Sequence, residues 1–418
     1  MEGGLPEGRR DRQDQGRQVQ VRDQGGLKLA KRNLLVVTNS FPDKEDRHIG
    51  GVFVKDQLRE MGSFFDEVYV VFPSTLGLGH EPREEFRDYT FGNVRVFFLA
   101  YLNVPLFLKV FRGGFSYMMA GAIDRLVKRE RLEFDLIHAH FTWPSGAAGA
   151  RLKRKHGVPL VVTEHTSLSL RAAIAAKDPQ YLETWAASDA VVRNRRGDIQ
   201  DLVSAGVPEE KVRYIPNGFD ADRFRPVDRA ASRERLGIPQ DGKVLVSIGG
   251  LEDVKGHRHL VDAMAEVSKA RGDVTCYIIG EGELHSALKR QAGSLGLAGK
   301  VVLAGRKPHG ELPYWVNAAD LVVHSSLSES GPMVMLEALG CGRPFIGTEV
   351  GSVPEVITSD DYGLVCRPGD PAALARTVLA GLEKQWDSAK IVAHSKQFSS
   401  EWVSKELVAL YTELLEGG

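Results

Sequence analysis

The sequence predicts an α/β protein made of two doubly wound parallel sheets, and three observations lead to that prediction. The chain has 418 residues, more than one hydrophobic core usually supports. Short apolar runs rich in β-branched residues recur along it and alternate with stretches of helical length, which is the pattern of βαβ units. These runs fall into two series separated by a turn-rich stretch, so each series is expected to build its own Rossmann-like domain.

Each apolar run has the features of a buried parallel strand, because it is short, rich in β-branched residues and closed by a polar or glycine-containing loop. The first series comprises residues 34–38, 68–72, 136–139, 160–163 and 190–192. The second comprises residues 244–248, 275–279, 301–304, 321–324 and 344–347. We therefore expect a first domain over residues 33–220 and a second over residues 240–390, with a linker near 220 to 240.

The two ends of the chain differ from this pattern. Residues 1–32 are rich in Arg, Gln, Gly and Asp and hold almost no large apolar side chains, so they are predicted to be a disordered extension. Near the other end, about residues 395–418, a helix is predicted with one apolar face formed by Val403, Leu407, Leu410 and Leu414.

Composition excludes several classes of protein. Lys plus Arg total 54 against 55 Asp plus Glu, and the net charge of -1 gives no general attraction to nucleic acid or to an anionic membrane. The three cysteines form no C-x-x-C pair, which argues against a disulfide framework or a zinc site. No signal peptide or apolar span of about 18 residues is present, so a cytoplasmic location is expected.

An anion site is predicted where a strand ends near Ser325 and a polar loop leads into a helix. Pro332 suits the first turn of that helix, whose unpaired N–H groups and partial positive charge attract anions. Glu337 lies about five residues into the helix, roughly 7.5 Å along it, and helical side chains lean toward the N-terminus. Its carboxylate can therefore reach the same crevice as Glu329. Two acids beside a phosphate site suit sugar hydroxyls, and a nucleotide-sugar offers both groups.

The segment from Glu329 to Glu337, with its Gly-Pro and Glu-Ala-Leu-Gly-Cys-Gly-Arg-Pro context, resembles the E-x7-E element of family 4 retaining glycosyltransferases. Those enzymes have the GT-B fold, in which two Rossmann-like domains face each other across a cleft. The resemblance extends from Asn33 to about Leu415, and it implies that the C-terminal helix returns to the N-terminal domain. It also implies that Glu337 binds the ribose diol and that Glu329 lies beside the donor sugar. Further donor contacts are expected from Ser330, Gly331, Met333 and Val334.

The stretch from Ser247 to Gly256 resembles the family's G-R-L-x-x-x-K-G element, whose basic pair neutralises the donor pyrophosphate. Lys255 matches the lysine of that element and is expected to take this role. Gly250 stands where many members carry arginine, so one cation is missing and must be replaced from elsewhere. The second-domain strand ends at Gly280 and at Arg306 are expected near the donor as well, the latter beside the nucleobase.

The first domain is expected to supply the opposite wall of the site. Gly50 and Gly51 lie in a loop that similar enzymes place against the donor phosphates and the acceptor, and glycine permits close backbone approach. The second histidine of His138-Ala139-His140 matches a family histidine near the donor sugar and the catalytic centre. His138 is predicted to be a packed or hydrogen-bonded partner of His140. His165 resembles a cleft residue on the acceptor side, and a purely structural role for it stays open.

The resemblance implies a hexosyltransferase-type enzyme (EC 2.4) that retains anomeric configuration without an enzyme nucleophile. His140, Lys255 and Glu329 are the predicted catalytic residues. No Asp-x-Asp motif is present, so neither a metal nor any other cofactor is expected. The partners expected are a nucleotide-sugar donor and a sugar, glycan or lipid-linked acceptor, without nucleic acid. Three alternatives stay open: a related sugar-nucleotide epimerase, a phosphorylase, and a degenerate nucleotide-sugar-binding subunit.

One segment gives a hint about the acceptor. Residues 97–119 mix aromatic and aliphatic side chains with Lys109 and Arg112, which would suit peripheral contact with the inner membrane face and a lipid-linked acceptor. The favoured interpretation is different: Phe107, Val110 and Phe111 keep the spacing of a helix that packs on its sheet.

Overall fold

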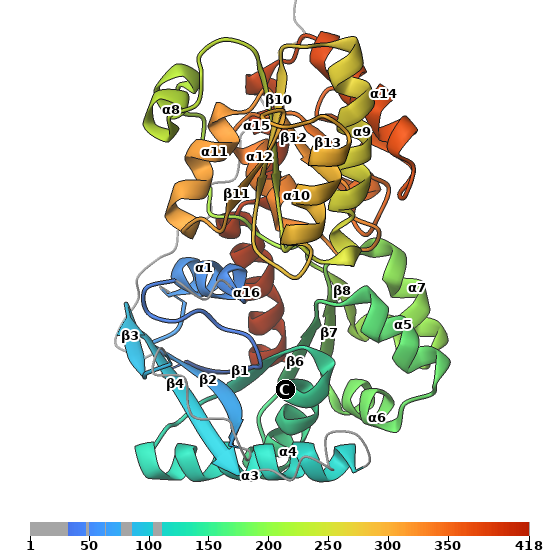
Figure 1. Ribbon diagram of the computed structural model, residues 1–418. Helices are drawn as coiled ribbons and strands as arrows, with labels where there is room; N and C mark the ends of the chain where they lie inside the picture. Colours follow the sequence, from blue (N-terminus) through green and yellow to red (C-terminus); the bar gives the residue numbers. More distant parts are fainter. Residues whose placement is uncertain (1–31, 47–49, 63, 77–85, 103–110, 418) are drawn as a thin grey trace, which may run out of the picture. The chain divides into compact units, whose positions relative to one another are not determined.

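The computed structural model describes residues 32–46, 50–62, 64–76, 86–102 and 111–417, and the predicted disordered extension lies outside them apart from Arg32. Two separate sheets organise this part of the chain (Figure 1). Among the described residues, no helix is both long enough and apolar enough to cross a membrane.

The first sheet has the strand order β3-β4-β2-β1-β5-β6-β7-β8, and every pairing in it is parallel except β3 with β4. Its strands are β1 (Asn33–Thr38), β2 (Glu67–Leu76), β3 (Tyr89–Phe91), β4 (Val94–Leu102), β5 (Leu136–His140), β6 (Leu160–Glu164), β7 (Ala190–Arg193) and β8 (Val212–Tyr214). The helices of this part are α1 (Val52–Met61), α3 (Arg112–Glu130), α4 (Ala147–His156), α5 (Ser167–Ala175), α6 (Pro179–Ala187) and α7 (Ile199–Ser204).

The second sheet is parallel throughout and has the order β11-β10-β9-β12-β13-β14. Its strands are β9 (Lys243–Ile248), β10 (Val274–Ile279), β11 (Val301–Gly305), β12 (Leu321–His324), β13 (Phe345–Thr348) and β14 (Gly363–Cys366). The helices that accompany it are α8 (Arg229–Leu236), α9 (His257–Ala270), α10 (His285–Ser294), α11 (Leu312–Ala318), α12 (Met333–Gly340), α13 (Val353–Val356), α14 (Pro371–Glu383) and α15 (Ser388–Ser395). Two parallel sheets with flanking helices confirm the predicted fold class.

Both sheets are buried on their two faces, because each central strand contributes side chains to two hydrophobic clusters. In β1, Leu35 and Val37 join one cluster while Leu34 and Val36 join the other, as strand alternation requires. In β9, Val244 and Val246 face one cluster and Leu245 faces the second. This double burial explains why the strands are continuous apolar runs in the sequence.

The last helix, α16 (Ser400–Glu416), belongs to the core of the first sheet. Val403, Leu407 and Leu410 are almost completely buried there, and the helix lies beside α1 (Figure 1). The Tyr411 hydroxyl lies 2.7 Å from His138 Nδ1, which ties the end of the chain to β5.

Two segments connect the parts of the chain, and they are hydrogen-bonded to each other. The amide of Phe219 donates to the carbonyl of Phe398 at 3.0 Å, and the amide of Ser400 donates to the carbonyl of Phe219 at 2.8 Å. These bonds form an isolated parallel bridge between the outgoing and the returning segment.

The structure adds two details to the sequence-based interpretation. Phe97, Phe98 and Tyr101 lie in the strand β4, in which burial partly alternates, whereas Phe107 and Val110, whose spacing predicted a helix, lie outside the described residues. Part of the predicted linker is helical, since α8 lies within residues 220–240 and packs on α11. Lys109 lies outside the described residues, and Arg112 forms an ion pair with Asp178. Peripheral membrane contact stays a prediction.

Gly340 at the end of α12 provides a test of how tightly the linker packs. A Cβ added there would lie 2.2 Å from Cε2 of Phe219 and 2.7 Å from the carbonyl oxygen of Phe224. We expect Gly340→Ala to lower the free energy of unfolding by roughly 1 to 3 kcal/mol through overpacking. The control is Gly293→Ala in α10, where an added Cβ meets nothing within 4 Å. That change should stabilise the protein by about 0.5 to 1 kcal/mol. Urea unfolding measures the free energy of unfolding of both variants. Equal changes in Gly340→Ala and Gly293→Ala would contradict tight packing at Gly340.

Candidate active site

The predicted site residues lie where each sheet reverses its strand order. The reversal falls between β1 and β5 in the first sheet and between β9 and β12 in the second. In open α/β sheets, ligands bind outside the carboxyl ends of the strands at such a point. His140 is the last residue of β5, Lys255 follows β9 and Glu329 follows β12.

The carboxylate of Glu329 is held by three donors on one oxygen. Lys255 Nζ lies 2.7 Å from Oε1, His324 Nε2 lies 3.0 Å from it, and the Ser326 hydroxyl donates to it at 2.8 Å. Ser326 Oγ is also 2.9 Å from His324 Nε2. The second carboxylate oxygen takes no part in these bonds, and it can accept a hydroxyl of a bound sugar.

These contacts decide the charge of Glu329. Burial raises the pKa of this carboxyl, but the hydrogen bonds and positive charges of His324 and Lys255 outweigh burial and bring the pKa to about 2. Glu329 is therefore an anion throughout the physiological range. His324 and Ser326 were missed in the sequence analysis, although the polar run His-Ser-Ser at the end of a buried strand could have indicated them.

Lys255 ends a short 3-10 turn (Asp253–Lys255) that leads through Gly256 into α9. Gly250, in the loop between β9 and this turn, has no side chain to offer in place of the family arginine. His257, the first residue of α9, is only 2% exposed, and its imidazole lies beside the backbone of Gly249 and Gly250. Burial, followed by the charge of His324, lowers the pKa of His257 to about 4.

Glu337 is the fifth residue of α12 and is almost fully buried. Its Oε1 lies 3.5 Å from Nε2 of His309, and Nη1 of Arg223 lies 2.5 Å from Nδ1 of the same imidazole. Because a guanidinium can only donate, Nδ1 of His309 accepts and the Nε2–H faces Glu337. Each of the two predicted glutamates therefore has an imidazole beside one of its oxygens.

Three histidines gather at the ends of β5 and β6. His140 Nδ1 lies 2.9 Å from His165 Nε2, and their rings are stacked with centroids 5.2 Å apart. His138 Nε2 contacts the Thr163 hydroxyl at 2.7 Å, and its Nδ1 contacts Tyr411. His138 is thus a buried, hydrogen-bonded neighbour of His140.

Burial keeps these three imidazoles uncharged. It lowers the pKa of His138 to about 3, and burial followed by the charge of Arg193 lowers the pKa of His165 to about 3. The pKa of His140 also falls well below its usual value, through burial and then through its two histidine neighbours. A neutral imidazole at His140 can accept or donate a hydrogen bond without repelling a positively charged sugar centre.

The Gly-Gly loop approaches these histidines through the first turn of α1. Gly51 caps α1 with a φ of 73°, and an added Cβ would lie 2.2 Å from the carbonyl oxygen of Ser40, so only glycine fits. Phe53 in that turn packs on His165 with ring centroids 4.8 Å apart. Gly50 precedes this cap in a turn.

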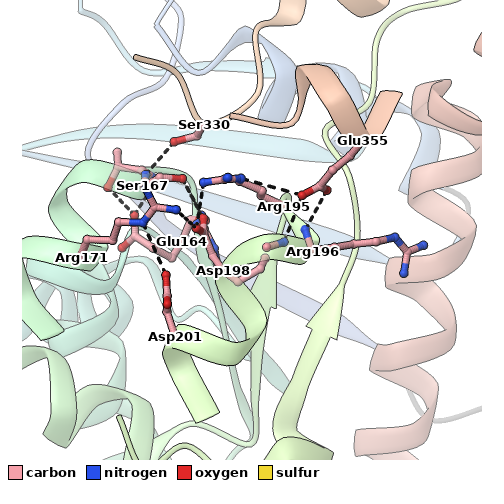
Figure 2. Close-up of polar contacts among 12 residues, drawn as sticks. Glu164, Ser167, Arg171, Arg195, Arg196, Asp198, Asp201, Ser330 and Glu355 are labelled. Atoms are coloured by element: carbon pink, nitrogen blue, oxygen red, sulfur yellow. Dashed lines mark hydrogen bonds and ion pairs between the residues drawn. The ribbon is translucent and has the colours of Figure 1, made fainter. Parts of the chain in front are cut away.

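The loop after Glu329 contacts residues of the first sheet, and Figure 2 shows these contacts. The Ser330 hydroxyl oxygen accepts a hydrogen bond from the amide of Ser167 at 2.7 Å. The Glu355 carboxylate accepts from the amides of Arg196 and Gly197 at 2.8 and 3.0 Å. Backbone amides after β6 and β7 of the first sheet thus donate to side-chain oxygens of residues that follow β12 and β13 of the second sheet.

A buried ion pair lies next to the segment that contacts Ser330. Arg193 and Asp198 are both completely buried and bonded to each other, and Arg193 also donates to the carbonyl of Glu164. Asp198 accepts from the Ser167 hydroxyl at 2.7 Å as well. Because an unpaired buried charge is costly, the pair fixes the segment that presents the Ser167 amide. The sequence analysis missed this pair, although the charged residues at the end of the apolar strand β7 could have indicated it.

The remaining predicted donor residues of the second sheet follow the carboxyl ends of β10, β11 and β12. Gly331 accepts a bond of 3.5 Å from the Asn217 side chain through its carbonyl, and Met333 and Val334 form the first turn of α12. Gly280 follows β10 and donates to the carbonyl of Gly305 at 3.1 Å, immediately before Arg306. In the described part of the chain, no group of three or more metal-ligating side chains could hold a metal ion.

Two family models match the chain on either side of the linker. Residues 50–223 match the model described as Glycosyltransferase Family 4, and residues 228–398 match Glycosyl transferases group 1. The chain belongs to the family 4 glycosyltransferases. Its class is therefore that of hexosyl transfer, EC 2.4, and the relatives reported below support sugar transfer rather than the alternatives.

Two relatives with similar sequences are both D-inositol 3-phosphate glycosyltransferases. The D-inositol 3-phosphate glycosyltransferase of Segniliparus rotundus is 32% identical over 72% of this chain and 70% of its own. The enzyme of the same name from Catenulispora acidiphila, numbered 1, is 32% identical over 68% of this chain and 74% of its own.

Solved structures confirm the GT-B fold of this glycosyltransferase. The Anabaena protein HepE, in complex with UDP, has a TM-score of 0.68 at 20% identity and covers 92% of this chain with 100% of its own. Sucrose-phosphate synthase from Thermosynechococcus elongatus has a TM-score of 0.74 at 20% identity, over 93% of this chain and 100% of its own.

The lowered pKa of His165 predicts a pH-dependent stability. In the unfolded chain an imidazole takes up a proton below about pH 6.5, whereas His165 in the folded protein does so only near pH 3. The contribution of uncharged His165 to the free energy of unfolding is therefore complete above pH 6.5 and is lost as the pH falls toward 3. Urea unfolding between pH 7 and pH 4 should show a shallower loss of stability in His165→Gln than in the wild type. The exposed His285→Gln should follow the wild type, and three parallel curves would contradict the prediction.

Proposed function

We propose that this glycosyltransferase uses a UDP-sugar as donor and transfers the sugar to an acceptor hydroxyl with retention of configuration. The single observation that carries the proposal is the carboxylate of Glu329 at the switch point of the second sheet, which is bonded through one oxygen to the side chains of Lys255, His324 and Ser326. The complex of the Anabaena protein of similar fold with UDP supports uridine as the nucleoside of the donor.

The residues would divide the work as follows. Glu337 would bind the ribose diol, with its carboxylate oriented by His309. Lys255 and the first turn of α12, including Met333 and Val334, would stabilise the diphosphate by charge and by backbone N–H groups. Glu329 would hold the sugar hydroxyls. The other proposed donor contacts are Gly50, Gly51, Gly280, Arg306, Ser330 and Gly331.

The reaction is proposed to proceed by attack on the same face that the leaving group departs from. The bond between the sugar carbon and the diphosphate oxygen breaks, and the acceptor oxygen forms the new bond. The acceptor proton passes to the departing diphosphate. Uncharged His140 would lie beside the positive sugar centre, and His165 would face the acceptor. Positioning and electrostatic stabilisation then supply the catalysis.

The acceptor is proposed to be a hydroxyl of a sugar, a glycan or a lipid-linked compound. D-inositol 3-phosphate, the compound in the name of the relatives, is the first acceptor to assay. If UDP-sugars are transferred to none of the acceptors in a broad panel that includes inositol phosphates, this part of the proposal is contradicted.

The two glutamates should affect different ligands. Glu337→Ala should weaken binding of free UDP, because the ribose contact persists without the sugar, by about tenfold for a lost charged hydrogen bond. Glu329→Ala should weaken binding of the UDP-sugar while leaving UDP closer to wild type. Calorimetry with UDP and with UDP-glucose measures both. The control is Glu283→Ala, an exposed carboxylate, and wild-type binding of both ligands by both site variants would refute the assignment.

Activity is expected without a metal ion or any other cofactor. Lys255 and backbone N–H groups would take the place that a divalent cation has in metal-dependent transferases. The rate of UDP release should therefore be unchanged after dialysis against EDTA. Loss of activity that Mg²⁺ or Mn²⁺ restores would show that the diphosphate needs a cation which the chain does not supply.

A further inference from the structure

A contact through Glu355 joins the two sheets in addition to the bond between Ser167 and Ser330. Both oxygens of the Glu355 carboxylate accept hydrogen bonds from backbone that follows β7, Oε2 from the amide of Arg196 at 2.8 Å and Oε1 from the amide of Gly197 at 3.0 Å (Figure 2). These amides open the 3-10 turn Arg196–Asp198, and the first N–H groups of a helical turn have no partner within it. A carboxylate satisfies them well, because such bonds are charge-assisted.

On the side of the first sheet, this turn is anchored in the core. Its last residue, Asp198, is completely buried and is bonded to Arg193. The same carboxylate accepts a hydrogen bond of 2.7 Å from the Ser167 hydroxyl. Ser167 lies just after His165 in the chain, so the turn, the Ser167 amide and the acceptor-side imidazole belong to one packed unit.

On the side of the second sheet, Glu355 is connected to the loop that carries Glu329. It lies in α13, directly after Ser352, whose amide donates to the carbonyl of Ser330 at 2.8 Å. Gly351 packs so closely on the same loop that an added Cβ would lie 2.5 Å from the carbonyl oxygen of Ser330 and 2.7 Å from that of Glu329. The segment of Glu355 and the residue proposed to hold the donor sugar are therefore fixed to each other.

We propose that Glu355 is a positioning residue which, together with the bond between Ser167 and Ser330, aligns the acceptor-side residues after β6 with the donor loop after β12. This inference rests on the proposed function of the site. A single contact would let the two parts pivot about it, whereas two contacts fix both their separation and their orientation. Glu355 touches neither substrate, and it acts on the reaction through the position of His165 relative to Glu329.

The geometry of the transfer makes this alignment important. The acceptor oxygen, on the side of the first sheet, must come within about 3 to 3.5 Å of the sugar carbon held by the second sheet, and small misplacements reduce the rate strongly. The nucleotide, in contrast, is proposed to bind mainly to Glu337 and Lys255, which both belong to the second sheet. Loss of Glu355 should therefore reduce transfer and leave nucleotide binding close to wild type.

Kinetics and calorimetry test this division. In Glu355→Ala we expect kcat for transfer from UDP-glucose, to D-inositol 3-phosphate or to another acceptor that the panel identifies, to fall at least about tenfold. Affinity for UDP should stay close to wild type. Glu355→Gln keeps one acceptor oxygen and should retain part of the rate, and the exposed Glu383→Ala in α14 is the control. Thermal unfolding checks that the variants fold. If UDP affinity falls as much as kcat, Glu355 supports the donor site itself, and the inference is wrong.

Hydrogen exchange of the free protein tests the alignment without any substrate. In Glu355→Ala the amides of Arg196 and Gly197 lose their acceptor, and their exchange should become faster by about tenfold or more. Because the two contacts act together, the Ser167 amide should also exchange faster, although Glu355 does not touch it. Mass spectrometry of the peptides measures both segments. Faster exchange confined to Arg196 and Gly197 would show that the contacts are independent and would overturn the inference.

The outcomes separate this inference from the proposed function. If the wild type neither binds nor turns over UDP-glucose, GDP-glucose or ADP-glucose, the donor site is refuted, whereas the exchange experiment still decides whether the two contacts act together. If the wild type transfers the sugar and Glu355→Ala does so at the same rate, only the role of Glu355 is refuted.

Discussion

The interaction on which the rest of the site depends is the bonding of a buried carboxylate, Glu329, by an ammonium, an imidazole and a hydroxyl. Burial acting alone would raise the pKa of this carboxyl and favour its neutral form, which is a poorer acceptor for sugar hydroxyls. Three donors on one oxygen keep it ionised and leave the other oxygen for a ligand. His324 ends β12, Ser326 follows it in the loop, and Lys255 lies in the 3-10 turn after β9, so the two central strands of the second sheet position all three donors.

The two sheets supply opposite electrostatic environments. The first contributes three imidazoles that burial keeps uncharged, and the second contributes ionised groups in close contact. A neutral surface suits a reaction centre that becomes positive, and a charged one suits a leaving diphosphate. The division follows from the strand ends, because β5 and β6 end in histidine or glutamate amid apolar packing, whereas the loops after β9 and β12 are polar.

The sequence predicted the strands of the two cores well, because double burial makes each an uninterrupted apolar run. It gave no strand at β4, whose aromatic residues suit a strand or a helix, and no helix at α8, which forms within the charged, proline-flanked stretch predicted to be the linker. For the site, a known motif located the glutamates and Lys255. Polar residues at the ends of β12 and β7 could have indicated His324 and Arg193 as candidates, but the contacts of His324, Arg193 and Asp198 depend on partners that local spacing does not identify.

The bridge between the two connecting segments has a mechanical consequence. Phe219 is hydrogen-bonded to the returning chain on both sides, through Phe398 and Ser400. Two unconnected segments would allow the sheets to turn about either one alone, whereas hydrogen bonds on both sides of Phe219 couple the two segments, so that they move together. Rotation of one sheet relative to the other would break contacts such as that of Ser167 with Ser330. The crossing point is also joined to the site itself, because Asn217, two residues before Phe219, donates to the carbonyl of Gly331 at 3.5 Å, in the loop that follows Glu329.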